Sequence, residues 1–294
     1  MAARKRGGNP PKGTKLRAGI QGELGAFSQQ AARQLLGDRV EVVPYQTFEN
    51  VFQALKNGTI EAGVIPIENT LAGSVHENYD HLLHFDVRIA AETNVRIIHN
   101  LIAPPGVKRK DIRKVYSHPV ALNQCLRFFA RHPKMERTSF YDTAGAVKMV
   151  MEARAPDAAA IGSEVAAAIY GADILRRSIE DDRHNFTRFF LLYATKRLPA
   201  RRPGRGPSKT SLVFTTRNTP GALFRALSAL ALRNLSLTKI ESRPLRGKPW
   251  EYLFYVDFLG SQDEPRVQNA LGHLMELADF LRVLGSYSET SAGA

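Results

Sequence analysis

Just beyond the middle of the chain, one pentapeptide combines a hydroxyl, a cation and an amide with two aromatic rings. It reads Asn185-Phe186-Thr187-Arg188-Phe189 and follows a short acidic stretch. Arg188 carries a planar fork of donors that suits a carboxylate, and Thr187 carries a proton that can move. We interpret these two residues as candidates for acid chemistry on a carboxylate-bearing substrate. The alternative is an ordinary edge strand whose polar residues face water.

Polar residues also recur where predicted strands end and predicted helices begin. The segments 22–28 and 66–74 each follow a strand, and helices are predicted to open at 142–144 and 162–164 and to span 120–129. Free N–H groups and hydroxyls at such places bind anions, although turns and helix caps explain the same residues. The candidate substrate-binding residues are Ser28, Asn69, Thr70, Thr143, Ser163, Asn185 and Phe189.

The sequence offers no pattern for a metal, a dinucleotide cofactor or a covalent nucleophile. The eight His residues lack the spacing of metal ligands, and segment 22–28 lacks the third glycine of a dinucleotide fingerprint. Cys125 is the single cysteine and has no visible partner for nucleophilic catalysis. We therefore expect a site without metal or cofactor. The lone thiol fits a reducing cytoplasm.

The net charge of +13 is concentrated in two segments. Residues 1–17 and 195–210 hold twelve of the 41 basic residues and none of the 28 acidic ones. Basic segments rich in Pro and Gly are typical of a disordered tail, here residues 1–15, and of a linker. Because no aromatic-rich basic face accompanies the charge, we expect no nucleic-acid partner. An apolar run long enough to span a membrane is also absent from the sequence.

Short apolar runs alternate with helical patterns over about residues 16–196, which indicates parallel strands covered by helices. The apolar, β-branched stretch 87–102 is long enough to carry the chain from one α/β lobe to another, and a later strand can return. We expect one lobe from 16–93 plus 185–196 and a second lobe from 94–184. A small ligand would bind in the cleft between them.

A second region follows a break rich in Pro, Gly and Arg. Residues 197–208 disfavour both helix and strand, so we expect a linker there. Residues 209–294 then follow the order βαββαβ, which is the ferredoxin-like arrangement, with the last strand expected over 281–286. Two groups of residues in this region could together cradle an amino acid. They are Asn218, Gly221, Ala222 and Leu223, and Glu241, Ser242, Arg243 and Pro244.

Taken together, these motifs closely resemble the prephenate dehydratase family over about residues 16–294. The C-terminal motifs resemble the regulatory ACT domain of that family. Two positions depart from the family pattern, because Thr70 stands where Ser is usual and Val120 where Gln is common. The matching segments are 22–28, 66–74, 117–125, 142–144, 161–171, 185–189, 218–223 and 241–244.

The resemblance implies a two-lobed α/β catalytic domain of the periplasmic-binding-protein-like (type II) kind, followed by an ACT domain, in a homodimer or larger oligomer. The implied enzyme is a carbon–oxygen lyase that converts prephenate into phenylpyruvate, water and carbon dioxide in phenylalanine biosynthesis. In it, Thr187 assists departure of the ring hydroxyl, and Arg188 orients a carboxylate or the Thr187 loop. Phenylalanine is the implied allosteric inhibitor, bound by the two C-terminal groups.

Two alternatives stay open on the sequence. Arogenate dehydratase performs the same chemistry on a substrate with an amine in place of the keto group, and segment 76–83 does not distinguish the two. A two-lobed fold also permits a non-catalytic module that senses amino acids, because fold alone does not fix function. The pairing of Thr187 with Arg188 favours the enzyme.

Overall fold

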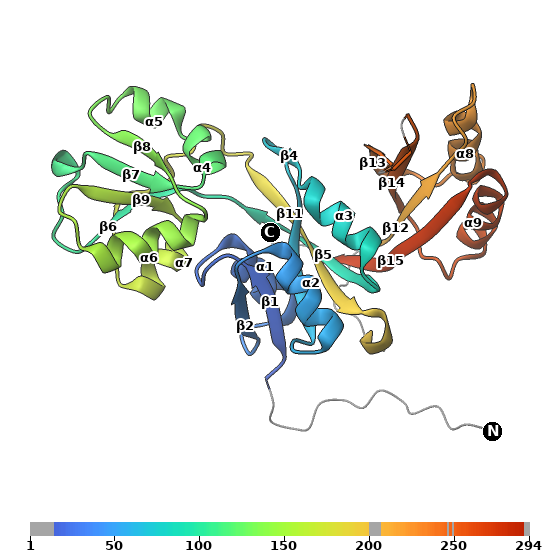
Figure 1. Cartoon of the computed structure of the whole chain (residues 1–294), viewed down its shortest axis with the longest axis horizontal. Coiled ribbons are helices and arrows are strands. Elements are labelled where there is room, and N and C mark those ends of the chain that lie inside the picture. The colour runs from blue at the N-terminus through green and yellow to red at the C-terminus, as the bar shows by residue number, and fades with distance from the viewer. Residues whose placement is uncertain (1–14, 200–206, 246, 249, 291–294) are drawn as a thin grey trace.

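The structure, a computed structural model, describes residues 15–199, 207–245, 247–248 and 250–290. Residues 1–14 of the predicted basic tail and most of the predicted linker lie outside the described residues. Two sheets, one of ten strands and one of five, organise the described chain, and helices cover them (Figure 1). This is the α/β architecture that the strand–helix alternation predicts.

The first lobe is built on one end of the larger sheet. Its elements are β1 (Arg17–Gln21), α1 (Phe27–Leu36), β2 (Glu41–Tyr45), α2 (Phe48–Asn57), β3 (Ala62–Asn69), β4 (Gly73–Ser74), α3 (His76–His84), β5 (Val87–Arg96) and β11 (Phe186–Ala194). Strand β1 pairs in parallel with β2 and β3, whereas β11 lies antiparallel between β3 and β5. Residues 187–193 of β11 are all buried, so this returning strand forms the centre of the lobe.

The second lobe is the five-stranded sheet with its helices. Its elements are β6 (Asn100–Ala103), the 3-10 helix η1 (Arg109–Asp111), β7 (Lys114–Ser117), α4 (Pro119–Asn123), α5 (Leu126–Ala130), β8 (Glu136–Ser139), α6 (Thr143–Ala153), β9 (Ala158–Gly162), α7 (Glu164–Tyr170) and β10 (Asp173–Arg176). The strand order is β10-β6-β9-β7-β8. The chain enters this lobe after β5 and leaves it after β10, so two connections join the lobes (Figure 1).

One helix prediction in the second lobe is wrong. The helix expected over 120–129 is two short helices, α4 and α5, which are separated by Gln124 and Cys125. At the break, the carbonyl of Gln124 accepts a hydrogen bond from the N–H of Asp181 at 2.7 Å. The interruption therefore fastens this segment to the chain that leads into β11.

The C-terminal region has the predicted βαββαβ order. Its elements are β12 (Ser208–Thr215), α8 (Ala222–Ala231), β13 (Leu237–Pro244), β14 (Tyr252–Leu259), α9 (Pro265–Leu277) and β15 (Phe280–Thr290), preceded by a 3-10 helix η2 (Thr195–Arg197). Strand β15 is longer than the predicted 281–286, because residues 288–290 pair in parallel with residues 91–93 of β5. The sheet of this region is therefore continuous with the sheet of the first lobe (Figure 1).

The junction between the two regions is apolar and buried. A single buried apolar cluster contains Ile89 and Phe190 from the first lobe and Val213 and Leu284 from the C-terminal region. Gly285 permits the approach, because a Cβ built there would stand 2.3 Å from the carbonyl oxygen of Ile89. The C-terminal region is thus docked on the first lobe through both backbone pairing and a shared core.

We predict that Gly285→Ala lowers the free energy of unfolding by about 1–3 kcal/mol, since the new methyl group meets backbone that cannot move aside. Urea unfolding of the full chain measures the effect. The matched control is Gly272→Ala, because Gly272 lies in α9 with open space around it. This control should stabilise the protein by about 0.5–1 kcal/mol. Equal effects of the two substitutions would contradict the close approach at Gly285.

Candidate active site

A cavity of about 450 Å³ lies between the two lobes. The first lobe contributes the start of α1, the end of β3 with β4, and the start of β11. The second lobe contributes α4 and the start of α6. The predicted residues in its lining are Ser28, Asn69, Thr143, Thr187 and Phe189. The predicted cleft therefore brings together side chains that are more than 150 residues apart in sequence.

The central pair of the cavity is Asn69 on β3 and Thr187 on β11. The two residues face each other in the strand pairing, and Asn69 Nδ2 donates a hydrogen bond to Thr187 Oγ1 at 2.9 Å. The same nitrogen lies 2.8 Å from Oδ1 of Asn185, which is fully buried. Because the Thr187 oxygen already accepts a hydrogen bond, its own proton can be directed into the cavity.

Gln124 is a cavity residue whose role the sequence did not indicate. Its Oε1 accepts hydrogen bonds from Asn185 Nδ2 and His99 Nε2, both at 2.9 Å, and its Nε2 lies 3.4 Å from Asn69 Oδ1. Gln124 therefore connects the second lobe to the Asn69–Thr187 pair. The only sequence signal was its place in segment 117–125, and the helix break that directs it inward was not predicted.

His99 lines the cavity as a neutral ring. It is 2% exposed, and burial lowers its pKa, although the hydrogen bond to Gln124 and the charge of Glu180 oppose the shift. Because Gln124 Oε1 accepts the bond, His99 Nε2 carries the proton and Nδ1 carries a lone pair. Within the described residues, Nδ1 has no hydrogen-bond partner. His99 thus borders the cavity without adding positive charge, and its Nδ1 is buried.

Helix ends, rather than cationic side chains, supply the positive potential of the cavity. Among the described residues, its lining contains neither Lys nor Arg. The helix α1 begins at the cavity and its N-cap, Ala26, provides no side-chain hydrogen bond, so its first N–H groups are available to an anion. The first residue of α6, Thr143, adds a hydroxyl. This arrangement suits a ligand that carries carboxylates.

The loop between β1 and α1 holds the lobes together at one side of the cavity. Asp142 caps α6 through the N–H of Gly145 at 2.8 Å and also accepts from the N–H of Glu23 at 3.2 Å. Burial raises the pKa of Asp142, although these backbone hydrogen bonds oppose the shift. Ser163 donates to the carbonyl of Gly25 at 2.6 Å. Ser163, which was predicted to bind substrate, therefore uses its hydroxyl to join the lobes and is absent from the cavity lining.

Two further predicted site residues point elsewhere. Thr70 Oγ1 donates to the carbonyl of His184 at 2.7 Å and accepts from the N–H of Phe186 at 3.0 Å, so it fastens the segment before β11. Arg188 lies on the face of β11 opposite Thr187, because neighbouring side chains of a strand alternate between faces. Its guanidinium contacts Glu92 and Asp257 and is absent from the cavity lining. The geometry therefore does not support Arg188 as an anchor for a substrate carboxylate.

The two groups predicted to cradle an amino acid lie apart within one chain. Asn218, Gly221, Ala222 and Leu223 line a cavity of about 180 Å³ together with aromatic residues that include Trp250 and Tyr252. The group 241–244 lies on β13 and does not line it. Glu241 and Arg243 instead contact the first lobe, at Ser74 (2.8 Å) and Asp80 (3.2 Å).

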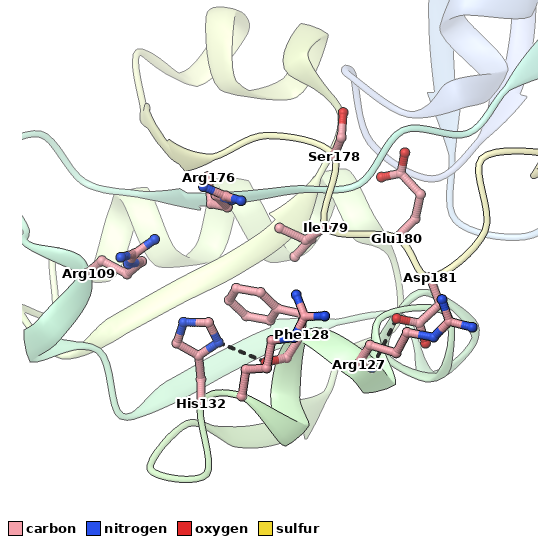
Figure 2. A pocket seen from close by; sticks show the side chains of 10 residues that line it. Arg109, Arg127, Phe128, His132, Arg176, Ser178, Ile179, Glu180 and Asp181 are labelled. Atoms are coloured by element: carbon pink, nitrogen blue, oxygen red, sulfur yellow. Dashed lines mark hydrogen bonds between the residues drawn. The ribbon is translucent and has the colours of Figure 1, made fainter.

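A basic groove of about 360 Å³ lies on the second lobe and contains none of the predicted site residues. Figure 2 shows Arg109 and Arg176 on one side of Phe128 and Arg127 on the other. The Nδ1 atom of His132 lies 2.8 Å from the carbonyl oxygen of Phe128, and a dashed line marks this contact in Figure 2. The groove therefore shares no lining residue with the inter-lobe cavity. Furthermore, the described chain contains no helix that could span a membrane and no cluster of side chains that could bind a metal ion.

We predict that Gln124→Ala lowers the free energy of unfolding by about 1–3 kcal/mol. The substitution leaves buried polar groups of Asn185 and His99 without their partner. The control is Asn123→Ala, which removes an exposed amide from the neighbouring position. Chemical denaturation of both variants gives the comparison. The inferred network is wrong if the two substitutions have the same effect.

The lowered pKa of His99 predicts a pH dependence of stability. The unfolded chain binds the His99 proton at a higher pH than the folded chain does, so stability falls as the pH falls below about 6.5, the ordinary His value. In urea titrations at pH 7.5 and 5.5, His99→Gln should lose less stability on acidification than the unsubstituted protein. His184→Gln, at a highly exposed position, is the control. An unchanged pH dependence in His99→Gln would count against the neutral buried ring.

Comparison with known proteins connects this site to a family. The family model described as prephenate dehydratase matches residues 18–197, and the ACT domain model matches residues 210–272. The chain is 43% identical over 294 residues to arogenate dehydratase 2 of Petunia hybrida, covering 95% of this chain and 73% of the relative.

Two solved structures share the fold over most of the chain. The prephenate dehydratase of Arthrobacter aurescens in complex with L-Phe superposes with a TM-score of 0.84 at 31% identity, covering 94% of this chain and 90% of that one. GqqA, described as a quorum quenching acylase, superposes with a TM-score of 0.83 at 34% identity, covering 93% and 98%. The chain therefore belongs to the prephenate dehydratase family, with an ACT domain after the catalytic domain.

Proposed function

We propose that this enzyme converts prephenate into phenylpyruvate, water and carbon dioxide, with Thr187 as the hydrogen-bond donor to the departing hydroxyl. The observation that carries the proposal is the Asn69–Thr187 pair in the lining of the inter-lobe cavity, in which the Thr187 oxygen accepts a hydrogen bond and keeps its own proton to donate. The family of the chain and the named activity of the Arthrobacter aurescens neighbour support the choice of substrate.

The chemistry needs few groups from the protein. Loss of carbon dioxide pushes an electron pair through the ring as the ring hydroxyl leaves, and aromatisation drives the reaction. Hydroxide is a poor leaving group, so a hydrogen bond or a proton must reach its oxygen as the bond breaks. Thr187 supplies this hydrogen bond, while Asn69 Nδ2 stabilises the Thr187 oxygen. General acid assistance of this kind contributes about 10²–10⁴-fold.

The two carboxylates of prephenate are bound by neutral donors. The N-terminus of α1, with Ser28, faces one side of the cavity, and Thr143 at the start of α6 faces it from the other lobe. The neutral His99 and the amide of Gln124 leave the cavity free of fixed cations. Binding between the lobes also removes the reacting centre from bulk water, which strengthens each of these hydrogen bonds.

The acylase activity named for GqqA finds less support in this geometry. Acyl transfer commonly uses a nucleophile that is hydrogen-bonded to a base. Among the described residues, no hydroxyl of the cavity lining is hydrogen-bonded to His99 or His118. Burial raises the pKa of the Cys125 thiol far above its ordinary value, so the thiolate is not formed at neutral pH. The geometry favours dehydration.

We predict that Thr187→Val lowers kcat by about 10²–10⁴-fold, because the hydroxyl is lost while the volume is kept. Thr187→Ser retains the hydroxyl and should keep most of the activity. Phenylpyruvate formation from prephenate is followed by absorbance, with phenylalanine formation from arogenate measured in parallel to decide the preferred substrate. Near-native turnover by a folded Thr187→Val variant would remove Thr187 from the mechanism.

The ACT domain carries the proposed regulation by phenylalanine. The cavity lined by Asn218, Gly221 and Leu223 joins a surface with exposed apolar side chains, among them Phe224 and Trp250. Exposed apolar surface of this kind is typical of an interface. We infer that a second copy of the chain covers it, in a homodimer or larger oligomer, and that phenylalanine binds between the two ACT domains. The cytoplasmic location of the enzyme, which rests on the single cysteine in the sequence, stays a prediction.

We predict that L-phenylalanine binds the full-length enzyme, as the Arthrobacter aurescens neighbour does in its complex, and inhibits turnover. Asn218→Ala should weaken binding at least about 10-fold, because it removes a polar contact from a buried interface, as such truncations cost about 1–3 kcal/mol. Asn269→Ala, an exposed position on α9, should leave it unchanged. Isothermal titration calorimetry measures both. No heat of binding in the unsubstituted protein would reject the proposed site.

A further inference from the structure

Arg188 lies at the centre of a buried ionic network between the catalytic domain and the ACT domain. Its guanidinium is 2.5 Å from Glu92 Oε2 on β5, 3.2 Å from Glu68 Oε1 on β3 and 2.7 Å from Asp257 Oδ2 on β14. Arg188 is 8% exposed, Glu92 0% and Asp257 5%. One of the three carboxylates around this cation therefore comes from the ACT domain.

The ACT domain also orients the carboxylate that it contributes. Ser211 on β12 donates to Asp257 Oδ1 at 2.5 Å, and the Ser211 and Tyr287 hydroxyls are 2.7 Å apart. The Tyr287 hydroxyl in turn accepts from Arg188 Nη2 at 3.2 Å. Three strands of the ACT domain thus hold Asp257 and Tyr287 against one guanidinium, so the contact depends on the docked position of the whole domain.

Two lysines of the ACT domain balance the remaining carboxylates. Lys209 pairs with Glu92, and Lys239 pairs with Glu68. Burial disfavours the charged form of Arg188, but Asp257, the nearest ACT carboxylate, raises its pKa well above the ordinary value. A buried charge that loses a partner is costly, so removal of Asp257 should shift the Arg188 side chain toward other partners.

Two successive residue pairs between β11 and β3 contain the catalytic pair and part of this network. Thr187 pairs with Asn69 and Arg188 pairs with Glu68 between β11 and β3. Because successive side chains face opposite sides of a strand, the side chains of the first pair face the cavity and those of the second pair face the ACT domain. A displacement of Arg188 therefore moves the backbone that places the Thr187 hydroxyl. Misplacement by about 1 Å can cost roughly 10²-fold in rate.

We propose that Arg188 is a positioning residue through which Asp257 of the ACT domain fixes the Thr187 hydroxyl, so that the docked ACT domain completes the active site. The inference rests on the proposed function of Thr187 and extends it to a residue of the regulatory domain. It also explains why Arg188 follows Thr187 in the chain although its side chain does not reach the cavity.

The experiment uses Asp257→Asn in the full-length enzyme. The variant keeps the shape of the side chain and removes its charge. We expect kcat to fall about 10–100-fold while KM changes less than about 3-fold, since the residues that bind carboxylates are untouched. The matched control is Asp279→Asn, which breaks an exposed ion pair with Arg217 on the ACT surface. This control should keep native kcat and KM.

A double substitution separates positioning from general destabilisation. In a Thr187→Val background, Asp257→Asn should cause no further loss of kcat, because no hydroxyl is left to misplace. A purely structural role would give the same fold-loss in both backgrounds. If Asp257→Asn does not fold, Ser211→Ala loosens the same carboxylate without removing its charge and should lower kcat in the same Thr187-dependent way.

The outcomes distinguish this inference from the function on which it rests. Native kcat in a folded Asp257→Asn variant, or equal losses in both backgrounds, overturns the positioning role and leaves the dehydratase assignment standing. If the unsubstituted enzyme forms no product from prephenate or arogenate, the proposed function itself fails. If Asp257→Asn does not fold, native kcat in Ser211→Ala overturns the positioning role in the same way.

Discussion

The antiparallel pairing of β3 with β11 is the constraint on which the rest of the structure depends. It sets Thr187 opposite Asn69 on the face toward the cavity and Arg188 opposite Glu68 on the face toward the ACT domain. A shift of one residue in this pairing would exchange the two faces, burying a hydroxyl among carboxylates and placing a guanidinium in the cavity. The burial of β11 between β3 and β5 is what excludes that shift.

The cavity is suited to an anionic substrate without containing fixed cations. Helix N-termini and neutral donors face it, while Arg188 and Lys239 are engaged by carboxylates on the other side of the sheet. The cavity and the ion pairs therefore lie on opposite faces of the sheet. The neutral donors of the cavity can bind a dianion, while the buried arginine and lysines hold the domains together. The loop 22–25 joins the two lobes by hydrogen bonds to Asp142 and Ser163 and by an ion pair between Glu23 and Lys148.

The ACT domain is docked by three kinds of contact that reinforce one another. Strand β15 pairs with β5, one apolar cluster spans the junction, and the buried ionic network contains carboxylates and cations from both sides. On the rim of the cavity, Ser74 donates to Glu241 of the ACT domain. Regulation by a ligand of the ACT domain can therefore reach the catalytic strand through the direct contacts between the two domains.

The sequence by itself determined the α/β architecture, the βαββαβ order of the C-terminal region and the cavity positions of Ser28, Asn69, Thr143 and Thr187. These follow from local periodicity and from polar residues at strand ends, which neighbouring residues encode. The tertiary structure alone decided that Ser163 joins the lobes, that Gln124 enters the site at a helix break, and that Arg188 faces the ACT domain. Each of these depends on partners distant in the chain: the carbonyl of Gly25, the N–H of Asp181, and Asp257 on a different domain. A strand pattern shows that Thr187 and Arg188 face opposite sides, but only packing decides which side is the cavity.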